Sequence, residues 1–339
     1  MRVIVVGNMS YGQNSRSVAE GYRRAGHDVR SVDTTKYHAG TLLTPTWARL
    51  RFTGKVSTAA ASSFRRELGD VSRGFDADLL LAIKTVNLPQ EDLLATPARV
   101  HAHMSFDDVS NPDNITDSYL EYEPQWDIVL TTKRHNVPEL IERGVRHPHF
   151  VWGAYDPDIR KRTREFRSRE YLVGFIGAAR PDRMDLPRQF ARYARGQSIV
   201  VGPRWRRRYP FGQRGVEMRT PAMGGDYTAV ANMIRFGLVR LNSENRDRHT
   251  NRSIETPATG QLAFLERTSE HEELFDDGRN AVLFGSESEL WERVAELAAH
   301  PASAERLADA GYRLITQGGF TYEDRAAEFE RHLIEVGAL

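Results

Sequence analysis

The chain opens with MRVIVVGNMSYGQNSRSVAEGYRRAGHDVRSV (residues 1–32), and this stretch decides the fold class. Residues 3–6 are a continuous run of β-branched residues that ends at Gly7, which is typical of a buried parallel strand. Residues 15–25 then have apolar side chains at helical spacing, and residues 27–32 have the composition of a second strand. Strand, glycine loop, helix and strand together make a βαβ unit.

The same pattern continues through the first half of the chain. Three more buried strands are predicted, at residues 78–83, 98–104 and 126–131. A helix is predicted at residues 137–143. The first half is therefore predicted to be a doubly wound α/β domain. Residues 38–75 are polar and rich in serine and arginine, which fits either a helix pair or a mobile loop.

A second α/β series follows a charged segment that contains a proline turn. Strands are predicted at residues 171–176, 198–201, 236–242 and 262–266. Helices are predicted at residues 227–234, 254–259, 287–299, 303–316 and 322–336. We therefore expect two doubly wound Rossmann-like domains that face a cleft. Their predicted limits are a first domain at 1–155, a linker at 156–170, a second domain at 171–320, and a last helix at 321–339 that is a candidate for crossing back to the first domain.

Composition and charge narrow the class of protein. Of 339 residues, 40% are hydrophobic and 27% are charged, as in a globular protein, and the formal net charge of +1 gives no global signal for nucleic acid or membrane. The chain has no cysteine, which excludes disulfides, thiolate zinc sites and cysteine nucleophiles. The start lacks the apolar core of a signal peptide, and no run approaches the roughly 18 apolar residues of a membrane span. We expect a cytoplasmic protein.

The first glycine loop, residues 7–12, follows a strand and opens a helix, so its backbone amides could face an anion. A dinucleotide site would need GxGxxG spacing and an acid such as Asp33, and the spacing is absent. A dinucleotide is therefore disfavoured. Gly12 is instead a candidate for approach to a donor or acceptor phosphate.

Two loops of the second half carry candidate diphosphate ligands. Gly177 permits close approach of the backbone, and Arg180 and Arg183 follow it in the sequence GAARPDR. Guanidinium groups neutralise the charge that develops on a nucleoside diphosphate leaving group. Arg204 begins a second basic cluster, which is either a solvated loop or an anion-binding rim. Trp205 beside it either belongs to the core or lines the cleft.

The densest group of polar residues lies between residues 242 and 260, after a buried strand. It includes Asp247, Asn251, Arg252 and Glu255, the last in the first turns of a predicted helix. Glu255 either interacts favourably with the helix dipole or accepts hydrogen bonds from both hydroxyls of a ribose. The concentration of these residue types directly after a strand favours a binding site.

Candidates for a general base follow the strand at 98–104. Asp107 and Asp108 lie at the expected cleft edge, where a carboxylate could take the proton of an acceptor hydroxyl. The alternative is that both only cap the following turn. His101 and His103 alternate on the strand and face the same side, so one of them lines the cleft or both belong to the core.

The second half resembles the C-terminal domain of the CgeB-type (spore-maturation) glycosyltransferases, relatives of the group 1 enzymes of GT-B fold. The stretches that carry the resemblance span roughly residues 170–335 in the family's order: FIGAARPDR (175–183), VVGPRW (200–205), LNSENRDRHTNRSIETPATGQLAFLER (241–267), ELFDDGRNAVLF (273–284), LADAGYRLI (307–315) and FTYEDRAAEF (320–329). A looser resemblance in the first half rests on LLLAIKT (79–85), HMSFDD (103–108), WDIVLTTK (126–133) and AYDPD (154–158).

The resemblance implies transfer of a sugar from a nucleoside-diphosphate sugar to an acceptor held mainly by the first domain. Glu255 matches the family's ribose-contacting glutamate, and Asn251 and Arg252 match the residues just before it. Asp247 stands where group 1 enzymes often carry a second acid, which contacts the donor sugar. Such enzymes usually need no metal, so neither a metal nor a cofactor beyond the nucleotide sugar is expected.

Two alternatives remain at this stage. One is a GT-B-fold epimerase that acts on the nucleotide sugar itself. The other is a nucleic-acid-associated protein, indicated by the arginines of 160–169 and 204–208, including a hybrid whose acceptor is a hydroxylated base in DNA. The acceptor is accordingly a small molecule, a glycan or DNA.

Overall fold

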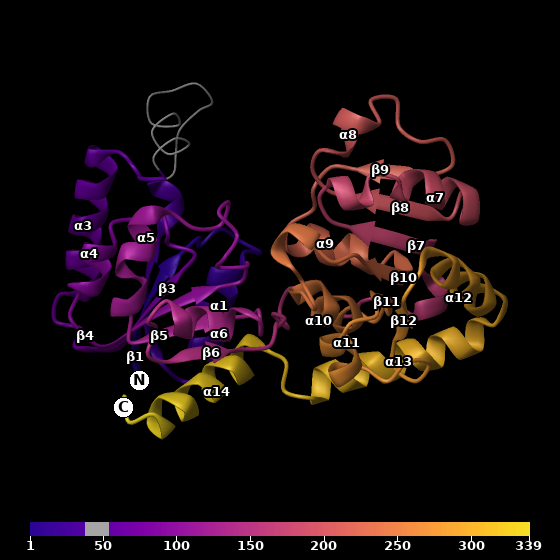
Figure 1. Ribbon diagram of the computed structural model, residues 1–339. Helices are drawn as coiled ribbons and strands as arrows, with labels where there is room; N and C mark the ends of the chain where they lie inside the picture. The colour runs from indigo at the N-terminus through magenta and orange to yellow at the C-terminus, as the bar shows by residue number, and fades with distance from the viewer. Residues whose placement is uncertain (38–53) are drawn as a thin grey trace. The chain divides into compact units, whose positions relative to one another are not determined.

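The computed structural model describes residues 1–37 and 54–339, which form two α/β units (Figure 1). Unit 1 comprises residues 1–152 and 322–339, and unit 2 comprises residues 153–321. Each unit contains a six-stranded sheet in which all neighbouring strands are parallel, so the predicted fold class is confirmed. Within the described ranges, no helix is both long and apolar enough to cross a membrane.

The sheet of unit 1 has the strand order β2-β1-β3-β4-β5-β6. Its strands are β1 (Arg2–Gly7), β2 (Asp28–Asp33), β3 (Ala77–Ile83), β4 (Ala98–Ser105), β5 (Ile128–Thr131) and β6 (Pro148–Phe150). Its described helices are α1 (Asn14–Arg24), η1 (Thr34–Lys36), α3 (Thr58–Ser72), α4 (Gln90–Leu94), α5 (Asp117–Tyr122), η2 (Glu123–Gln125), α6 (Asn136–Glu142) and α14 (Tyr322–Glu335). Residues 3–6 are fully buried in β1, as their continuous apolar run predicts.

The last helix of the chain, α14, belongs to unit 1 and packs against α1 (Figure 1). The two helices approach closely at Gly21, where a Cβ atom would lie 2.6 Å from the backbone carbonyl carbon of Tyr322. A glycine on α1 is therefore what allows the helix from the end of the chain to pack here.

The stretch 38–75, predicted as a helix pair or a mobile loop, is only partly covered by the structure. Residues 38–53 lie outside the described residues. The remainder contains the single helix α3, whose first turn is capped by Ser57 through its hydroxyl and the Ala60 N–H at 3.2 Å. Phe64 and Leu68 anchor this helix in the core of unit 1.

The sheet of unit 2 has the order β9-β8-β7-β10-β11-β12, so the strand order reverses between β7 and β10. Its strands are β7 (Tyr171–Ile176), β8 (Ser198–Val201), β9 (Glu217–Arg219), β10 (Ile234–Val239), β11 (Leu262–Glu266) and β12 (Val282–Phe284). Its helices are η3 (Phe166–Ser168), η4 (Pro181–Arg183), α7 (Leu186–Tyr193), α8 (Trp205–Arg208), α9 (Gly224–Ala231), η5 (Ser243–Asn245), α10 (Asn251–Ala258), α11 (Ser269–Leu274), α12 (Glu287–Ala299) and α13 (Pro301–Gln317).

The two segments at which the chain enters and leaves unit 2 pair with each other. The Tyr155 N–H donates to the Phe320 carbonyl at 3.0 Å, and Tyr155 forms a parallel bridge with Thr321. The stretch 156–170, predicted as a linker, lies within unit 2, where Phe166 is part of the hydrophobic core.

Candidate functional site

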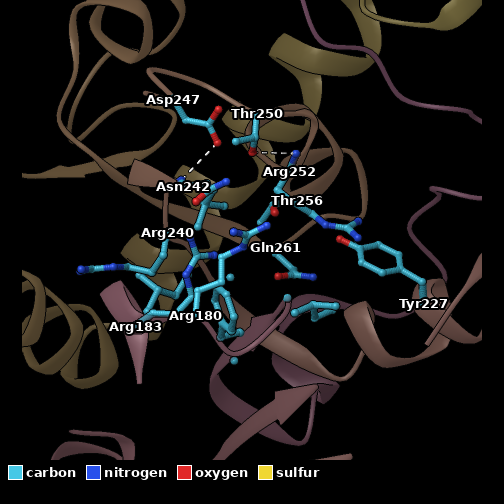
Figure 2. A pocket seen from close by; sticks show the side chains of 17 residues that line it. Arg180, Arg183, Tyr227, Arg240, Asn242, Asp247, Thr250, Arg252, Thr256 and Gln261 are labelled. Carbon is cyan, nitrogen blue, oxygen red and sulfur yellow. Dashed lines mark hydrogen bonds between the residues drawn. The ribbon is translucent and has the colours of Figure 1, made fainter. Parts of the chain in front are cut away.

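A pocket of about 190 Å³ opens at the carboxyl ends of β7 and β10, where the strand order of unit 2 reverses (Figure 2). Its walls come from the end of β7, the following η4, α9, the end of β10 and α10. In open α/β sheets, ligands bind outside the carboxyl ends of the strands at such a switch point. The topology of unit 2 therefore positions this pocket as the candidate binding site.

Glycines allow the two loops beside the pocket to approach closely. Gly177 follows β7 and lines the pocket, and a side chain at Gly202 would collide with the Gly177 carbonyl. Gly202 also has a φ of 152°, which disfavours other residues. The Trp205 indole N–H donates to the Gly177 carbonyl at 2.8 Å. Since Trp205 is buried, it belongs to the core and supports the loop from behind.

Four guanidinium groups line the pocket: those of Arg180, Arg183, Arg240 and Arg252 (Figure 2). Arg180 forms an ion pair with Glu244, and Arg240 pairs with Glu266 at 2.7 Å. Arg183 is buried and donates to the Leu241 carbonyl at 2.6 Å, which fixes it at the end of β10. Such a concentration of guanidinium groups favours binding of a phosphorylated ligand.

Glu255 lies behind the pocket wall, in a buried cluster of charges. Its carboxylate accepts a hydrogen bond from Arg160 Nε at 2.9 Å and forms an ion pair with Arg252. Both guanidinium groups lie over the ring of Tyr227, at 4.0 Å and 4.1 Å from its centroid. Burial alone would raise the pKa of Glu255, but the two arginines outweigh it and hold the pKa below its usual value. Glu255 is therefore ionised and fixes Arg252.

The loop before α10 is held by its own hydrogen bonds. Asp247 lines the pocket and accepts from the Asn242 N–H at 3.1 Å. Thr250 caps α10, accepting from the Arg252 N–H at 3.2 Å (Figure 2). β10 ends at Val239, whereas the sequence predicted a strand to residue 242. The next residue, Arg240, lines the pocket.

The N-terminus of α10 is also tied to neighbouring elements by buried histidines. His249 accepts from the Gly153 N–H at 3.2 Å and contacts Glu270 at 2.5 Å. The His271 ring hydrogen-bonds the Ser253 hydroxyl at 2.8 Å. Asn251 does not line the pocket; it lies against Gly153, where a Cβ atom would come within 2.8 Å of its Oδ1.

Arg204 lies outside this pocket, in an exposed segment. It has a left-handed backbone with φ of 70° and precedes the short helix α8. The arginines at 206–208 are exposed as well. Exposed guanidinium groups fit both a solvated loop and an anion-binding rim.

Gly12 lies in the first loop of unit 1 and has a φ of 83°, a conformation that favours glycine. Asp33 supports the same loop, because its Oδ1 accepts from the Met9 N–H at 3.2 Å and from the Thr35 N–H at 3.1 Å. Asp33 therefore accepts hydrogen bonds from the backbone on both sides of the loop.

Asp107 and Asp108 follow β4 in unit 1. Asp107 is partly exposed and forms an ion pair with Lys84, a residue with a left-handed backbone at the end of β3. Asp108 is buried and accepts from the Asn136 side-chain amide at 2.7 Å and from the Ser110 N–H at 2.9 Å. The structure thus gives the two neighbouring carboxylates different surroundings.

The two histidines of β4 contact other residues of unit 1. His103 is buried against Tyr119, whose hydroxyl lies 2.9 Å from its Nδ1, and burial lowers its pKa to about 3. His101 hydrogen-bonds the Thr96 carbonyl at 2.8 Å. Both are structural residues of unit 1.

Tyr227, Arg240 and Gln261 are among the pocket residues that were not candidates from the sequence. Arg240 was hidden inside a predicted strand, and Tyr227 in a predicted helix. Within residues 1–37 and 54–339, no three or more His, Asp or Glu side chains are grouped so that they could hold a metal ion.

Comparison with known proteins supports the fold. Residues 183–331 match the family model described as glycosyl transferase-like. Three solved structures align over nearly the whole chain. An α-glucosyltransferase in complex with UDP and a 13-mer DNA containing an HMU base has a TM-score of 0.68 and 13% identity, covering 99% of both chains. Sucrose-phosphate synthase from Thermosynechococcus elongatus has a TM-score of 0.66 and 14% identity, covering 100% of both chains.

The third structure is HepE from Anabaena in complex with UDP and glucose, with a TM-score of 0.66 and 12% identity, covering 99% of this chain and 100% of that one. No curated protein sequence matches this chain. The fold is therefore that of the GT-B glycosyltransferases. The residues that match the glycosyl transferase-like model include the part of the pocket lining from Arg183 to Gln261.

Proposed function

We propose that this protein is a glycosyltransferase that moves a hexosyl or pentosyl group from a nucleoside-diphosphate sugar to an acceptor hydroxyl. The observation that carries the proposal is the pocket with four guanidinium groups at the β7/β10 switch point. The solved neighbours with UDP and with UDP-glucose support it. The resemblance of this region to CgeB-type enzymes supports that subtype, and the absence of cysteine is compatible with a cytoplasmic enzyme.

In this proposal the arginines bind the diphosphate. Arg180, Arg183 and Arg252 are placed to neutralise the charge that develops on the leaving group, so that the transfer requires neither metal nor cofactor. Glu255 has lone pairs left beside its two arginine partners, and we assign to them the ribose hydroxyls. Asp247 is assigned to the donor sugar, and Asn251 to support of α10.

We assign the acceptor to unit 1 and the proton transfer to Asp107. Its side chain is 25% exposed, whereas that of Asp108 is 2% exposed and hydrogen-bonded by Asn136. An accessible carboxylate can accept the proton of an acceptor hydroxyl, and the buried one can hold the loop. Gly12, in the first loop of the same unit, is assigned to the approach of a phosphate-bearing ligand.

The test is binding of nucleoside diphosphates and their sugars in EDTA, measured by calorimetry. The Arg180→Ala variant should bind the nucleoside diphosphate, such as UDP, about tenfold more weakly. Its affinity for the corresponding nucleoside, which lacks phosphates, should change little. The control is Arg188→Ala, which removes an exposed guanidinium group of α7 outside the pocket. If the intact protein binds none of these ligands without a metal, the proposal is wrong.

A second candidate concerns the acceptor. The neighbour crystallised with HMU-containing DNA and the exposed arginines at 204–208 favour transfer to a hydroxylated base in DNA. The expected result is DNA binding that weakens steeply with salt, and sugar transfer to an oligonucleotide that contains the base. If the rate at which the donor is consumed does not change when DNA is added, DNA is not the acceptor. If the donor sugar is converted to an epimer and no sugar is transferred, the protein is an isomerase instead.

A further inference from the structure

A strongly basic segment, residues 192–219, lies at one edge of the sheet of unit 2. It contains eight arginines and a single acidic residue, Glu217, so its formal charge is +7, whereas the whole chain carries +1. The segment runs through β8, α8 and β9, and β9 is the last strand at its edge of the sheet. Figure 1 shows α8 and the chain that follows it standing out beyond β8 and β9. Positive charge is therefore concentrated on one protruding part of unit 2.

Most of the guanidinium groups of this segment face the solvent. The exposed ones are Arg195, Arg204, Arg206, Arg207, Arg208 and Arg214. Arg195 lies beside the end of the protruding chain, since a Cβ atom on Gly215 would come within 2.6 Å of its Cγ. Within residues 1–37 and 54–339, none of the six forms an ion pair with a carboxylate, although their neighbours Arg188 and Arg219 both do. Such a cluster favours an anionic partner outside the chain.

Two buried aromatic residues hold the protruding chain in place. Trp205 donates its indole N–H to the Gly177 carbonyl at 2.8 Å, and Tyr209 donates its hydroxyl to the Met184 carbonyl at 2.8 Å. The Gly212 N–H then donates to the Tyr209 carbonyl at 3.0 Å, which closes a tight turn over residues 209–212. The tip of the segment is therefore a defined turn on a packed base.

Phe211 lies in this turn and is completely exposed. A phenylalanine among arginines is typical of segments that bind at a membrane interface, where the ring enters the acyl boundary and the charges stay among anionic headgroups. A ring that is exposed on every side is buried completely by a medium that surrounds it. An unpaired base stacked on the ring would cover one face only. Phe211 therefore favours a lipid over a nucleic acid as the partner.

An open hollow beside α8 fits the same type of partner. It has a volume of about 470 Å³, and its lining combines Arg206 with the apolar residues Met218, Ala222 and Val230; Asp226 also lines it. A guanidinium group beside apolar walls matches a lipid, which joins an anionic headgroup to an apolar chain. The phosphates and sugars of a nucleic acid backbone offer no such apolar part.

We infer that the basic segment docks this protein on an anionic lipid surface, with its arginines among the headgroups and Phe211 in the acyl boundary. The inference goes beyond the proposed function and does not depend on it, because among the described residues none of 192–219 lines the candidate pocket. The arginines at 204–208 are those of the DNA candidate above, so the two partners compete for one surface. Since docking combines charge with an apolar anchor, it needs both and weakens with salt.

The test is co-sedimentation of the full chain with lipid vesicles. Phosphatidylcholine vesicles with about 30% phosphatidylglycerol should bind the protein at least about tenfold more tightly than vesicles of phosphatidylcholine alone. Raising the salt from about 50 mM to about 500 mM should weaken this binding about tenfold or more, because the headgroup charges are then screened.

A first pair of variants tests the charge. Replacing the arginines at 206–208 together by glutamine should weaken binding to the anionic vesicles at least about tenfold. The matched control combines Arg66→Gln, Arg279→Gln and Arg313→Gln, which removes the same charge at exposed positions elsewhere on the chain and should leave binding unchanged. All six side chains are exposed, so both proteins should keep the melting temperature of the unmodified chain.

A second set of variants tests the apolar anchor. Phe211→Ser should weaken binding to the anionic vesicles about tenfold, whereas Phe211→Trp should retain it, because indole also enters the acyl boundary. The matched control is Ile141→Ser, which removes an apolar side chain that is 58% exposed on α6 of unit 1. This control should bind the vesicles as the unmodified protein does.

Fluorescent duplex and single-stranded oligonucleotides, measured at the same salt concentrations, provide the competing partner. If the protein binds oligonucleotides but no anionic vesicles, the basic segment serves a nucleic acid and the inference is overturned. It is also overturned if vesicle binding stays unchanged in Phe211→Ser or in the variant without the arginines at 206–208. Failure of the proposed function would show as absent binding of nucleoside diphosphates, and it would leave the vesicle result unaffected.

Discussion

At Glu255, one arginine from a distant part of the sequence and one from the same helix both contact the carboxylate. Arg160 lies 95 residues before Glu255, and Arg252 lies on the same helix. Because Glu255 is buried, removing its charge leaves a buried guanidinium group at Arg160 without its partner. Breaking a buried ion pair in this way typically costs about 3–5 kcal/mol. The carboxylate that is proposed to bind ribose is thus also a stabilising residue of unit 2.

The pH dependence of this cluster follows from the lowered pKa of Glu255. Its stabilising effect is fully present above the usual value of 4.5 and is lost as the pH falls through the lower folded value. The variant Glu255→Gln should therefore be less stable than the unmodified protein at pH 7, and the difference should shrink below about pH 4.5. Urea unfolding of both proteins between pH 7 and pH 3 measures it. A difference that stays constant over this range would contradict the ionised pair.

A second prediction concerns Gly237. Alanine there collides with Thr256 and Gln261, so Gly237→Ala should destabilise unit 2 by about 1–3 kcal/mol and weaken nucleotide binding. Gly225→Ala is the matched control, because a Cβ atom at that helical position meets nothing within 4 Å. We expect the control to keep full affinity and to gain a few tenths of a kcal/mol. Calorimetry and thermal unfolding check both variants. Unchanged binding in Gly237→Ala would argue against a ligand in the part of the pocket that Gly237 lines.

Part of this site was visible in the sequence because its residues follow strand ends. Gly177, Arg180, Arg183, Asp247 and Arg252 all line the pocket. Gln261 gave no comparable signal. It stands between a helix and a strand, and its side chain lines the pocket and donates a hydrogen bond to the Ala231 carbonyl that only the folded chain makes.

At the scale of elements, the packing of α14 against unit 1 includes two stacked imidazole rings. His149 of β6 and His332 of α14 lie with ring centroids 3.8 Å apart. The pKa of His149 is lowered to about 4, mainly by burial and to a smaller extent by the nearby His332. Burial also lowers the pKa of His332, against the opposing influence of Glu335 and Glu328. The two rings therefore stack as neutral groups.

Acidification should consequently loosen this helix. The unfolded chain binds protons at these histidines near pH 6.5, above the folded values, so stability falls as the pH drops from about 6.5 towards 4. Hydrogen exchange in α14, corrected for intrinsic rates, should be faster at pH 5 than at pH 7.5. The variant His332→Phe keeps an aromatic ring and should reduce this difference. The control His300→Phe, at an exposed position of unit 2, should leave hydrogen exchange in α14 unaffected. If both variants change the pH dependence of exchange in α14 equally, the stacked pair is not its cause.

The elements that the sequence predicted well are those with long apolar runs. The predicted strands at 171–176 and 198–201 agree with β7 and β8. The short strands β6, β9 and β12 were missed, because three residues are too few to show a period. The sequence did not clearly predict the helix α3, because its exposed face is rich in small and polar residues and only Phe64 and Leu68 are buried.

At the scale of the whole molecule, two separate cores should respond separately to ligand. Among the described residues, those that line the candidate pocket all belong to unit 2, so a nucleotide bound there should stabilise that unit directly. At 100 times its dissociation constant, it should add about 2.7 kcal/mol to the stability of unit 2. Hydrogen exchange should show added protection in β7, β10 and α10, with little in β1 and β3. Protection confined to unit 1 would place the nucleotide elsewhere.

The return of α14 to unit 1 has a consequence for biosynthesis. Unit 2 is one uninterrupted segment, 153–321, whereas unit 1 is completed only by residues that the ribosome adds after all of unit 2. Until then, the surface of α1 around Gly21 has no covering helix. The nascent polypeptide therefore emerges with an incomplete first half, and a stalled or truncated translation product would expose that apolar surface to aggregation and to chaperones.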